Sequence, residues 1–269
     1  MVYKAKQAEA VTIRKLILDF RKEQARCGMK KMYVDLKGQL QERGIKRGRD
    51  AMFDFARAND LLVKKTKLYH VTTDSKHHFY KSPNLIKDIL PFRAEQAFAA
   101  DITYIRIEND WAYLALVTDL YSKKIMGYKL ANNMKADMVV EALQMARRNC
   151  IHKRKQIIHH SDRGIQYCCP QYASFAINNG FQLSTTEQYD PYENAVAERI
   201  NGILKYEFGL VNTIPTLEIA HKMVNHAVEI YNNKRRHWSL NLTTPSEAHR
   251  KQKHQYVSYT RGIDHRKKC

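Results

Sequence analysis

The feature that most constrains the fold of this chain is a change of hydrophobic period near residue 97. Before that point, apolar residues recur every three or four positions, as they do on amphipathic helices. From 97 to 107 and from 111 to 120 the chain is instead rich in Ile, Tyr, Val and Leu, and the turn Glu108-Asn109-Asp110 separates the two stretches. This pattern predicts a β-hairpin.

After the hairpin, the expected elements alternate in type. Further strands are expected over 125–130, 156–160 and 181–184, and helices over 135–149, 172–178 and from Glu193 onward. Three sequential strands followed by alternating helices and strands are typical of a mixed sheet in an α/β domain, for which an RNase H-like fold is the leading candidate. We assign this core to residues 97–208.

Three short helices are expected before the core, in residues 1–62. Their apolar repeats begin near Ile13, Met29 and Met52, and Gly44 separates the second from the third. This arrangement predicts a small helix-turn-helix-like domain that precedes the mixed-sheet core. Residues 63–96 have mixed charge and many turn residues, so we expect a linker there.

The third of these helices, over 48–59, is the candidate for contact with DNA. Arg49 could face a phosphate, but Asp50 and Asp54 would repel one. Sequence-specific reading of DNA and plain packing of a helical bundle therefore stay open as alternatives of about equal weight for this helix.

The distribution of charge favours nucleic acid as the partner. The formal net charge is +19, of which residues 1–96 hold +11, residues 97–208 hold +1, and the basic C-terminal helical extension, residues 209–269, holds +7. Basic flanks around a nearly neutral middle are expected where the flanks grip phosphates and central carboxylates hold cations. No apolar run approaches the roughly 20 residues that span a bilayer. The five cysteines form no CxxC pair, so we expect a cytoplasmic, nucleoid-associated protein without a zinc ribbon.

Three carboxylates lie where burial of a charge is unfavourable or where reactive groups are expected. Asp101 lies inside the first strand of the core, where burial of an unpaired charge is unfavourable. Asp162 follows the fourth strand directly, and α/β sheets place reactive groups at strand ends. Glu198 lies on the last long helix of the core, on one face with Asn194 and Lys205. We therefore expect Asp101, Asp162 and Glu198 to form one catalytic, metal-binding site.

Other polar residues near these positions have more ordinary explanations. Asp119 ends a strand before a turn, and turn chemistry explains it well. His159 and His160 face opposite sides of their strand, so at most one can point at the site, and packing or hydrogen bonding explains both. For Arg163 and Gln166, just past the strand end, we favour a role in supporting the active site.

Several segments together resemble a known family. They are Asp101-Ile102-Thr103-Tyr104-Ile105, His160-Ser161-Asp162-Arg163-Gly164-Ile165-Gln166-Tyr167, the helix from Glu193 to Glu207, the thirty-five residues between Asp162 and Glu198, the stretch from Gly28 to Leu62, and the closing residues 231–237 with Thr244-Pro245. They resemble the OrfB-type transposases of the insertion-sequence-three family, which belong to the retroviral-integrase superfamily with a DDE triad. The resemblance runs from about residue 10 to about residue 250.

The resemblance implies an RNase H-like core, two Mg²⁺ or Mn²⁺ ions, and cleavage and transfer of DNA strands by Asp101, Asp162 and Glu198. It also implies double-stranded DNA, as transposon end and target, and a homo-oligomer on DNA. A product of an upstream reading frame, or a frameshift fusion to it, is a further partner in such relatives. The residues that we expect to contact DNA are Lys30, Lys31, Arg49, Arg163, Gln166, Asn194, Lys205, Lys234, Arg235, Arg236 and His237.

Three carboxylates suit this chemistry because hard divalent cations prefer oxygen ligands. Two cations about 4 Å apart activate a water or a 3′-hydroxyl on one side of a phosphate and stabilise the leaving oxygen on the other. Two alternatives stay open: an RNase H-like nuclease that cuts without joining, and a DNA-binding protein derived from a transposase. With 16 tyrosines, composition alone does not exclude a covalent tyrosine nucleophile.

Overall fold

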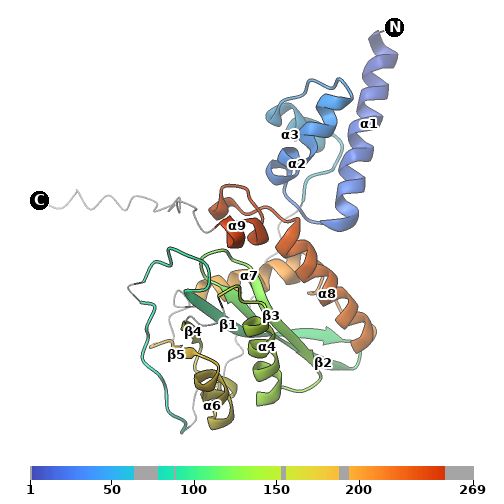
Figure 1. The fold of residues 1–269 in the computed structure, drawn as a ribbon. Coiled ribbons are helices and arrows are strands. Elements are labelled where there is room, and N and C mark those ends of the chain that lie inside the picture. The colour runs from blue at the N-terminus through green and yellow to red at the C-terminus, as the bar shows by residue number, and fades with distance from the viewer. Residues whose placement is uncertain (1, 64–77, 88, 153–155, 188–193, 252–269) are drawn as a thin grey trace, which may run out of the picture.

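The computed structural model describes residues 2–63, 78–87, 89–152, 156–187 and 194–251. A bundle of helices at the N-terminus stands on one end of an α/β core, with α8 (Leu217–Asn233) and α9 (Pro245–Lys251) next to the junction between them (Figure 1). The bundle consists of α1 (Val2–Glu23), α2 (Met29–Glu42) and α3 (Arg49–Ala58). The three expected N-terminal helices are thus confirmed.

The bundle is held together by the apolar faces that the sequence pattern predicted. Ile13 and Ile17 on α1 meet Met32 and Leu36 on α2 and Met52 on α3. All five side chains are almost completely buried. Burial of such a side chain contributes about 1.5–3 kcal/mol, which is enough to bring three short helices together.

The core contains a mixed five-stranded sheet with the order β3-β2-β1-β4-β5. Its strands are β1 (Ala97–Ile107), β2 (Asp110–Asp119), β3 (Ile125–Ala131), β4 (Ile157–Ser161) and β5 (Phe181–Thr185). β1, β2 and β3 pair antiparallel, as the predicted hairpin requires. β4 is parallel to β1, and β5 is parallel to β4, so β1 lies at the centre of the sheet.

Helices cover both faces of the sheet (Figure 1). α4 (Ala136–Arg148) and α6 (Pro170–Asn178) pack on one face, and α7 (Ala195–Glu207) and α8 (Leu217–Asn233) pack on the other. Successive residues of β1 alternate between the two faces, so that Phe98 and Ala100 face α4 whereas Ala97 and Ala99 face α7. The same alternation directs Asp101 to the α7 face.

Some short elements were not predicted. α5 (Ile165–Cys168) forms three residues after Asp162, and the described part of the C-terminal extension contains η2 (Trp238–Leu240) and α9 (Pro245–Lys251) after α8. These are short, and helices of one or two turns give little periodic signal in a sequence. The start of the long helix was expected at Glu193, which lies outside the described residues, and α7 begins at Ala195.

The segment that we expected to be a linker is packed on the core in its described part. The Leu85 amide donates to Ser184 Oγ at 2.8 Å, at the end of β5. Ile86 packs with Ala97, Ala99 and Leu120 against the α7 face. Residues 78–87 therefore add a layer to the core, although they form no helix or strand.

A buried polar network fastens α9 to the sheet. His249 lies between Ser122 Oγ, 3.0 Å from its Nδ1, and Glu95 Oε1, 3.3 Å from its Nε2. Burial would raise the pKa of Glu95, but hydrogen bonds from His249 and from the Ile151 and His152 amides lower it to about 2. The C-terminal extension is thus held by buried hydrogen bonds as well as by apolar packing.

Among the helices described, none combines the length and the apolar composition that a membrane crossing requires. The described cysteines Cys27, Cys150, Cys168 and Cys169 are free thiols. Cys269 lies outside the described residues.

Candidate active site

Two of the expected catalytic carboxylates lie on neighbouring strands at the same sheet edge. Asp101 is in β1, and Asp162 follows the last residue of β4. The parallel register pairs Ala100 with Ser161, and Asp101 and Asp162 directly follow this last registered pair. The Asp162 carboxylate also accepts a hydrogen bond from the Gly164 amide at 3.0 Å, which fixes the turn into α5.

Helix α7 brings the third carboxylate to this edge. Asn194, its N-cap residue, donates from Nδ2 to the Ala100 carbonyl at 3.1 Å. Two turns further on, Asn201 donates from Nδ2 to Asp101 Oδ2 at 2.7 Å. Glu198 lies between these contacts on the same helical face, and its side chain is exposed.

The three carboxylates perturb one another electrostatically. Burial, followed by the charge of Asp162, raises the pKa of Asp101 to about 7, against hydrogen bonds from Asn201 and the Ile102 amide. Burial and the charge of Asp162 also raise the pKa of Glu198. Carboxyl groups that repel one another at a strand end favour a cation between them, and such shifts cluster at functional sites.

The side chains do not yet form a complete coordination shell. Among the described residues, no group of three His, Cys, Asp or Glu side chains is close enough as it stands to hold a metal ion. Without a cation, mutual repulsion keeps carboxylates apart, and an exposed side chain such as Glu198 can change rotamer. The donor set fits a hard divalent ion in chemistry, because Asp101, Asp162 and Glu198 all supply oxygen.

Asn201 is a site residue that the sequence analysis missed. It lies three positions after Glu198 and seven after Asn194, so helical spacing places it on the face already assigned to Asn194, Glu198 and Lys205. Lys205 also lies at the site: burial lowers its pKa and the nearby charge of Asp101 opposes that shift. The periodicity of the helix could have identified Asn201.

Arg163 and Gln166 both flank Asp162, but their polar ends contact backbone. Arg163 Nε donates to the Thr186 carbonyl just beyond β5. Gln166 Nε2 donates to the Met134 carbonyl before α4 at 3.1 Å. Both contacts fasten the turn after β4 to its neighbours, which is consistent with supporting the active site.

The two histidines before Asp162 are packing residues in this structure. His159 is buried among aromatic rings and its Nε2 contacts the Tyr172 hydroxyl. His160 is buried on the other side, with its Nδ1 2.8 Å from Ser184 Oγ. Tyr167 is electrostatically coupled to Asp101 and Asp162, and burial raises its pKa well above the ordinary value. That shift argues against Tyr167 as a nucleophile, since attack requires the phenolate.

Asp119 has the turn role that its position suggested. It is completely buried at the end of β2. Its Oδ1 accepts from the Ser122 amide at 2.6 Å, and its Oδ2 accepts from the Glu95 amide at 2.7 Å. Asp119 therefore joins the turn after β2 to the segment that leads into β1.

The C-terminal cations that we expected to contact DNA are engaged within the protein. Lys234 pairs with Glu23 at 2.7 Å, and Arg236 pairs with Asp35 at 2.5 Å. Arg235 is buried and pairs with Glu207. Contact of these residues with DNA stays a prediction, and for Arg235 burial speaks against it.

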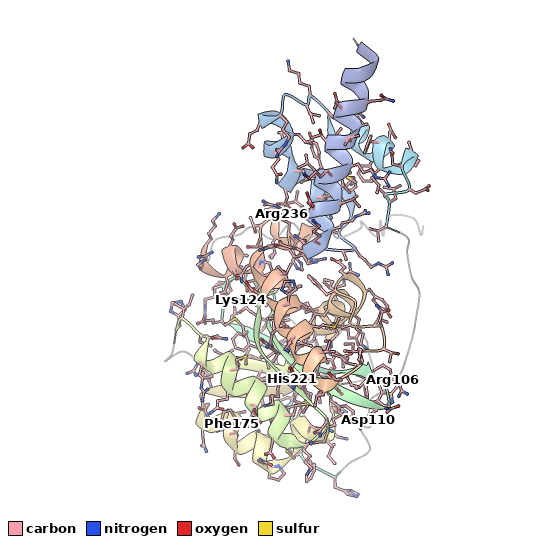
Figure 2. All side chains as sticks on the ribbon, turned by 90° about the vertical axis from the view of Figure 1, so that its right-hand side faces the viewer. Arg106, Asp110, Lys124, Phe175, His221 and Arg236 are labelled. Carbon is pink, nitrogen blue, oxygen red and sulfur yellow. The ribbon has the colours of Figure 1, made fainter. Side chains whose placement is uncertain are left out.

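His237 and the two lysines of α2 lie in the same region. His237 Nε2 is 2.8 Å from Arg235 Nη1. Lys31 is buried, with Nζ 3.6 Å from Glu207 Oε2, whereas Lys30 is exposed and lies over the Trp238 ring. In the side view, Arg236 marks the level at which the bundle meets the core (Figure 2).

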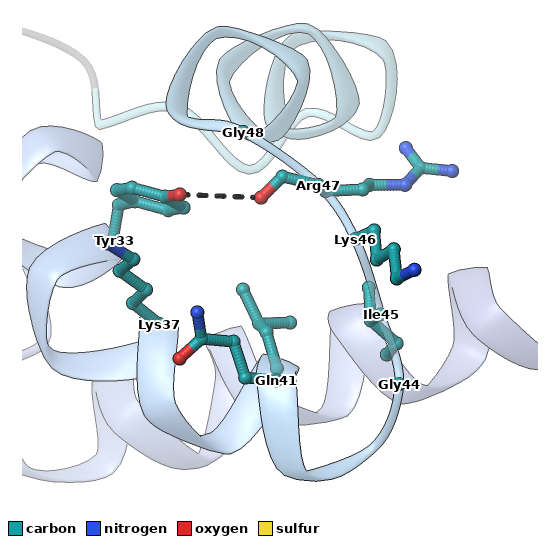
Figure 3. A pocket seen from close by; sticks show the side chains of 9 residues that line it. Tyr33, Lys37, Gln41, Gly44, Ile45, Lys46, Arg47 and Gly48 are labelled. Carbon is teal, nitrogen blue, oxygen red and sulfur yellow. Dashed lines mark hydrogen bonds between the residues drawn. The ribbon is translucent and has the colours of Figure 1, made fainter.

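The candidate DNA-reading helix α3 carries internally balanced charge. Arg49 pairs with Asp50 at 2.9 Å, and Arg57 pairs with Asp54 at 2.7 Å. A groove of about 490 Å³ lies beside the turn before α3, between Tyr33 and Arg47 (Figure 3). The side chains of Lys46 and Arg47 point away from this groove (Figure 3).

Comparison with known families shows that the sheet and its flanking helices match the integrase core domain. Two descriptions of the integrase core domain match the chain, over residues 93–191 and 179–245. Together they cover the sheet, the three carboxylates and the segment from Lys234 to His237.

Individual relatives agree with these matches. The chain is 32% identical over 225 residues to the insertion element IS600 uncharacterized 31 kDa protein of Shigella sonnei, covering 83% of this chain and 82% of that protein. It is 32% identical over 186 residues to transposase InsF for insertion sequence IS3fB of Escherichia coli, covering 67% of this chain and 63% of that protein.

A solved structure supports the fold. A chain of the simian T-cell lymphotropic virus intasome aligns with a TM-score of 0.51 and 14% identity, over 87% of this chain and 74% of that chain. At this identity the likeness concerns the fold alone. The expected RNase H-like core, preceded by N-terminal helices, is confirmed.

Proposed function

Because this chain belongs to the insertion-sequence-three family of transposases with an integrase core domain, we propose that it cleaves DNA at the ends of an insertion sequence and joins the freed strand to a target. The observation that carries the proposal is that Asp101 and Asp162 directly follow Ala100 and Ser161, the last registered pair of β1 and β4, with Glu198 on the helix that Asn201 ties to Asp101. This is a metal-dependent polynucleotidyl transferase with a DDE triad.

We assign the metal ligands to Asp101, Asp162 and Glu198, with Mg²⁺ or Mn²⁺ as the ions and two per site. When bound, the ions lower the pKa of the attacking water or 3′-hydroxyl and stabilise the leaving oxygen. Asp101, with its raised pKa, must lose its proton before it can serve as a ligand. Asn201 donates to Asp101 Oδ2 and the Ile102 amide donates to Asp101 Oδ1, and these two contacts orient the carboxylate.

Positive charge near the carboxylates guides the DNA backbone in this proposal. Lys205 lies on the α7 face that carries Glu198 and interacts electrostatically with Asp101. An ammonium group there can contact a phosphate close to the scissile bond. Two copies or more of the chain act together on double-stranded DNA, because a transposon has two ends, and the chain works with DNA in the cytoplasm.

Reaction products separate this function from its alternatives. The purified chain is incubated with Mn²⁺ and labelled duplex DNA that carries the ends of its own element. Joined products support a transposase, and cut products without joining support a nuclease of the same fold. Bound but uncut DNA would mean a DNA-binding protein and would contradict the proposal.

A further inference from the structure

A charged cluster joins the N-terminal bundle, the C-terminal segment and helix α7. Arg235 holds Glu207 with two parallel hydrogen bonds, Nε to Oε2 and Nη2 to Oε1, both 2.7 Å long. Lys31 of α2 approaches the same carboxylate at 3.6 Å. We name Lys31, Glu207 and Arg235 the Glu207 anchor.

The two cations of the Glu207 anchor are largely buried, and the pKa shifts of Glu207 and of the neighbouring His237 indicate how these two groups are protonated. The side chain of Arg235 is only 4% exposed and that of Lys31 only 10%. Burial raises the pKa of a carboxyl group, but Arg235 and Lys31 lower that of Glu207, so this group is ionised. Burial and the charges of Arg235 and Lys31 hold the pKa of His237 well below its usual range, so neutral His237 accepts from Arg235.

Glu207 is the last residue of α7, the helix that also carries Glu198. The two glutamates are nine positions apart, which is about 13.5 Å at 1.5 Å per residue. The helix is tied to the sheet near its start by Asn194 and in its middle by Asn201. The Glu207 anchor fixes its end, so a shift or rotation there is passed along a rigid helix to Glu198.

We propose that Arg235 and Lys31 are positioning residues for Glu198, and that Lys31 makes the geometry of the active site depend on how the bundle is docked. This inference rests on the proposed function, because it takes Glu198 as a metal ligand. The planar fork of Arg235 fixes both carboxylate oxygens of Glu207, which one ammonium group does not do. Lys31, which lies on α2, connects Glu207 to the N-terminal bundle.

The inference assigns the basic closing segment a role other than phosphate contact. If Arg235 contacted DNA, its loss would weaken DNA binding and reduce the salt dependence by about 0.9 counterions. If it positions Glu198, its loss should lower kcat and weaken metal binding while DNA affinity and its salt dependence stay unchanged. The two roles therefore predict changes in different quantities.

The test compares Arg235→Lys, Arg235→Met and Lys31→Met in the full chain. Arg235→Lys keeps the charge and loses the fork, so kcat for strand transfer should fall about ten-fold. Arg235→Met should lower kcat about a hundred-fold, the scale expected for a displacement on the order of 1 Å. Lys31→Met should lower kcat about ten-fold. KM for DNA should not change in any variant.

A second readout does not depend on turnover. Calorimetric titration with Mn²⁺ alone should show weaker binding to Arg235→Lys than to the unaltered chain, because Glu198 is displaced as a ligand. Lys222→Ala is the control, since Lys222 lies on α8 and makes an exposed pair with Glu218. It should change neither kcat nor the Mn²⁺ affinity.

Unchanged kcat and unchanged Mn²⁺ affinity in Arg235→Lys and Lys31→Met would overturn the inference, as would a loss confined to DNA affinity. Circular dichroism establishes folding, and if Arg235→Met does not fold, the other two variants decide. Strand transfer by the unaltered chain distinguishes failure of the proposed function from failure of the positioning role. Its absence would contradict the proposed function, whereas its presence with normal Arg235→Lys turnover would contradict only the positioning role.

Discussion

Helix α7 carries two glutamates whose surroundings are opposite. Glu198 lies among like charges, and burial together with Asp162 raises its pKa. Glu207, nine residues later, meets Arg235 and Lys31, which lower its pKa in spite of burial. One end of the helix therefore has a surplus of negative charge, and the other end has its charge neutralised by neighbouring side chains.

This difference distinguishes a glutamate at a candidate metal site from a glutamate that stabilises the fold. Carboxylates that lie close enough to repel one another cost free energy, which a cation can recover, so their presence indicates a binding site. A carboxylate with a bidentate arginine has no need of a further partner and contributes to the arrangement of the fold. The same distinction applies to α3, where each arginine is paired with an aspartate.

The largest expected effect comes from removing a charge where the carboxylates repel one another. Asp162→Asn should lower strand cleavage and joining by at least about a thousand-fold, because a neutral amide is a poor ligand for a hard cation and metal contributes several kcal/mol. The fold should persist and DNA affinity should stay the same or rise slightly. Strand transfer and DNA binding are measured on the same preparation. Near-normal strand transfer would contradict the assignment of Asp162.

Removing a charge at the compensated end should instead change stability. Glu207→Gln leaves Arg235 and Lys31 buried without a counter-charge, which costs about 3–5 kcal/mol of unfolding free energy. Lys222→Ala, which breaks the exposed pair with Glu218, is the control and should cost about 0.3–0.5 kcal/mol. Urea unfolding followed by circular dichroism measures both. Equal losses of unfolding free energy in the two variants would show that the Glu207 anchor stabilises the fold no more than an exposed ion pair does.

A third prediction concerns pH and the metal-free protein. The pKa of Asp101 is raised from 3.8 to about 7, so the folded state binds more protons than the unfolded state between these values. Stability should therefore fall as pH rises through this window. Asp101→Asn should stabilise the protein at pH 8 by on the order of 2 kcal/mol and have little effect at pH 4. Unfolding in EDTA at both pH values provides the measurement, and an equal effect at the two would contradict it.

The smallest expected effect is a change in DNA affinity after substitution on α3. Arg49 is already paired with Asp50, so Arg49→Ala should lower DNA affinity by less than about three-fold and leave the salt dependence nearly unchanged. Asp50→Asn is the complementary variant and should raise affinity by freeing Arg49. A decrease of about 0.9 in the salt slope for Arg49→Ala would instead establish a phosphate contact.

Much of the fold and part of the candidate site could be predicted from the sequence. The strands and long helices have strong periodic patterns, and Asp162 directly follows a strand, where a sheet places reactive groups. Asn201 could have been found from helical spacing. The partners of Arg235 could not, because Glu207 and Lys31 meet it only through tertiary packing between segments far apart in the chain.

The central claim is that Asp101, Asp162 and Glu198 form one metal site at the end of α7 opposite to Glu207. The most direct measurement is to grow crystals with Mn²⁺ and locate the ion by its anomalous scattering. We predict Mn²⁺ between Asp101 and Asp162, with Glu198 turned toward it and oxygen ligands about 2.1 Å away. Mn²⁺ bound elsewhere, or no ion at these carboxylates at millimolar Mn²⁺, would contradict the claim.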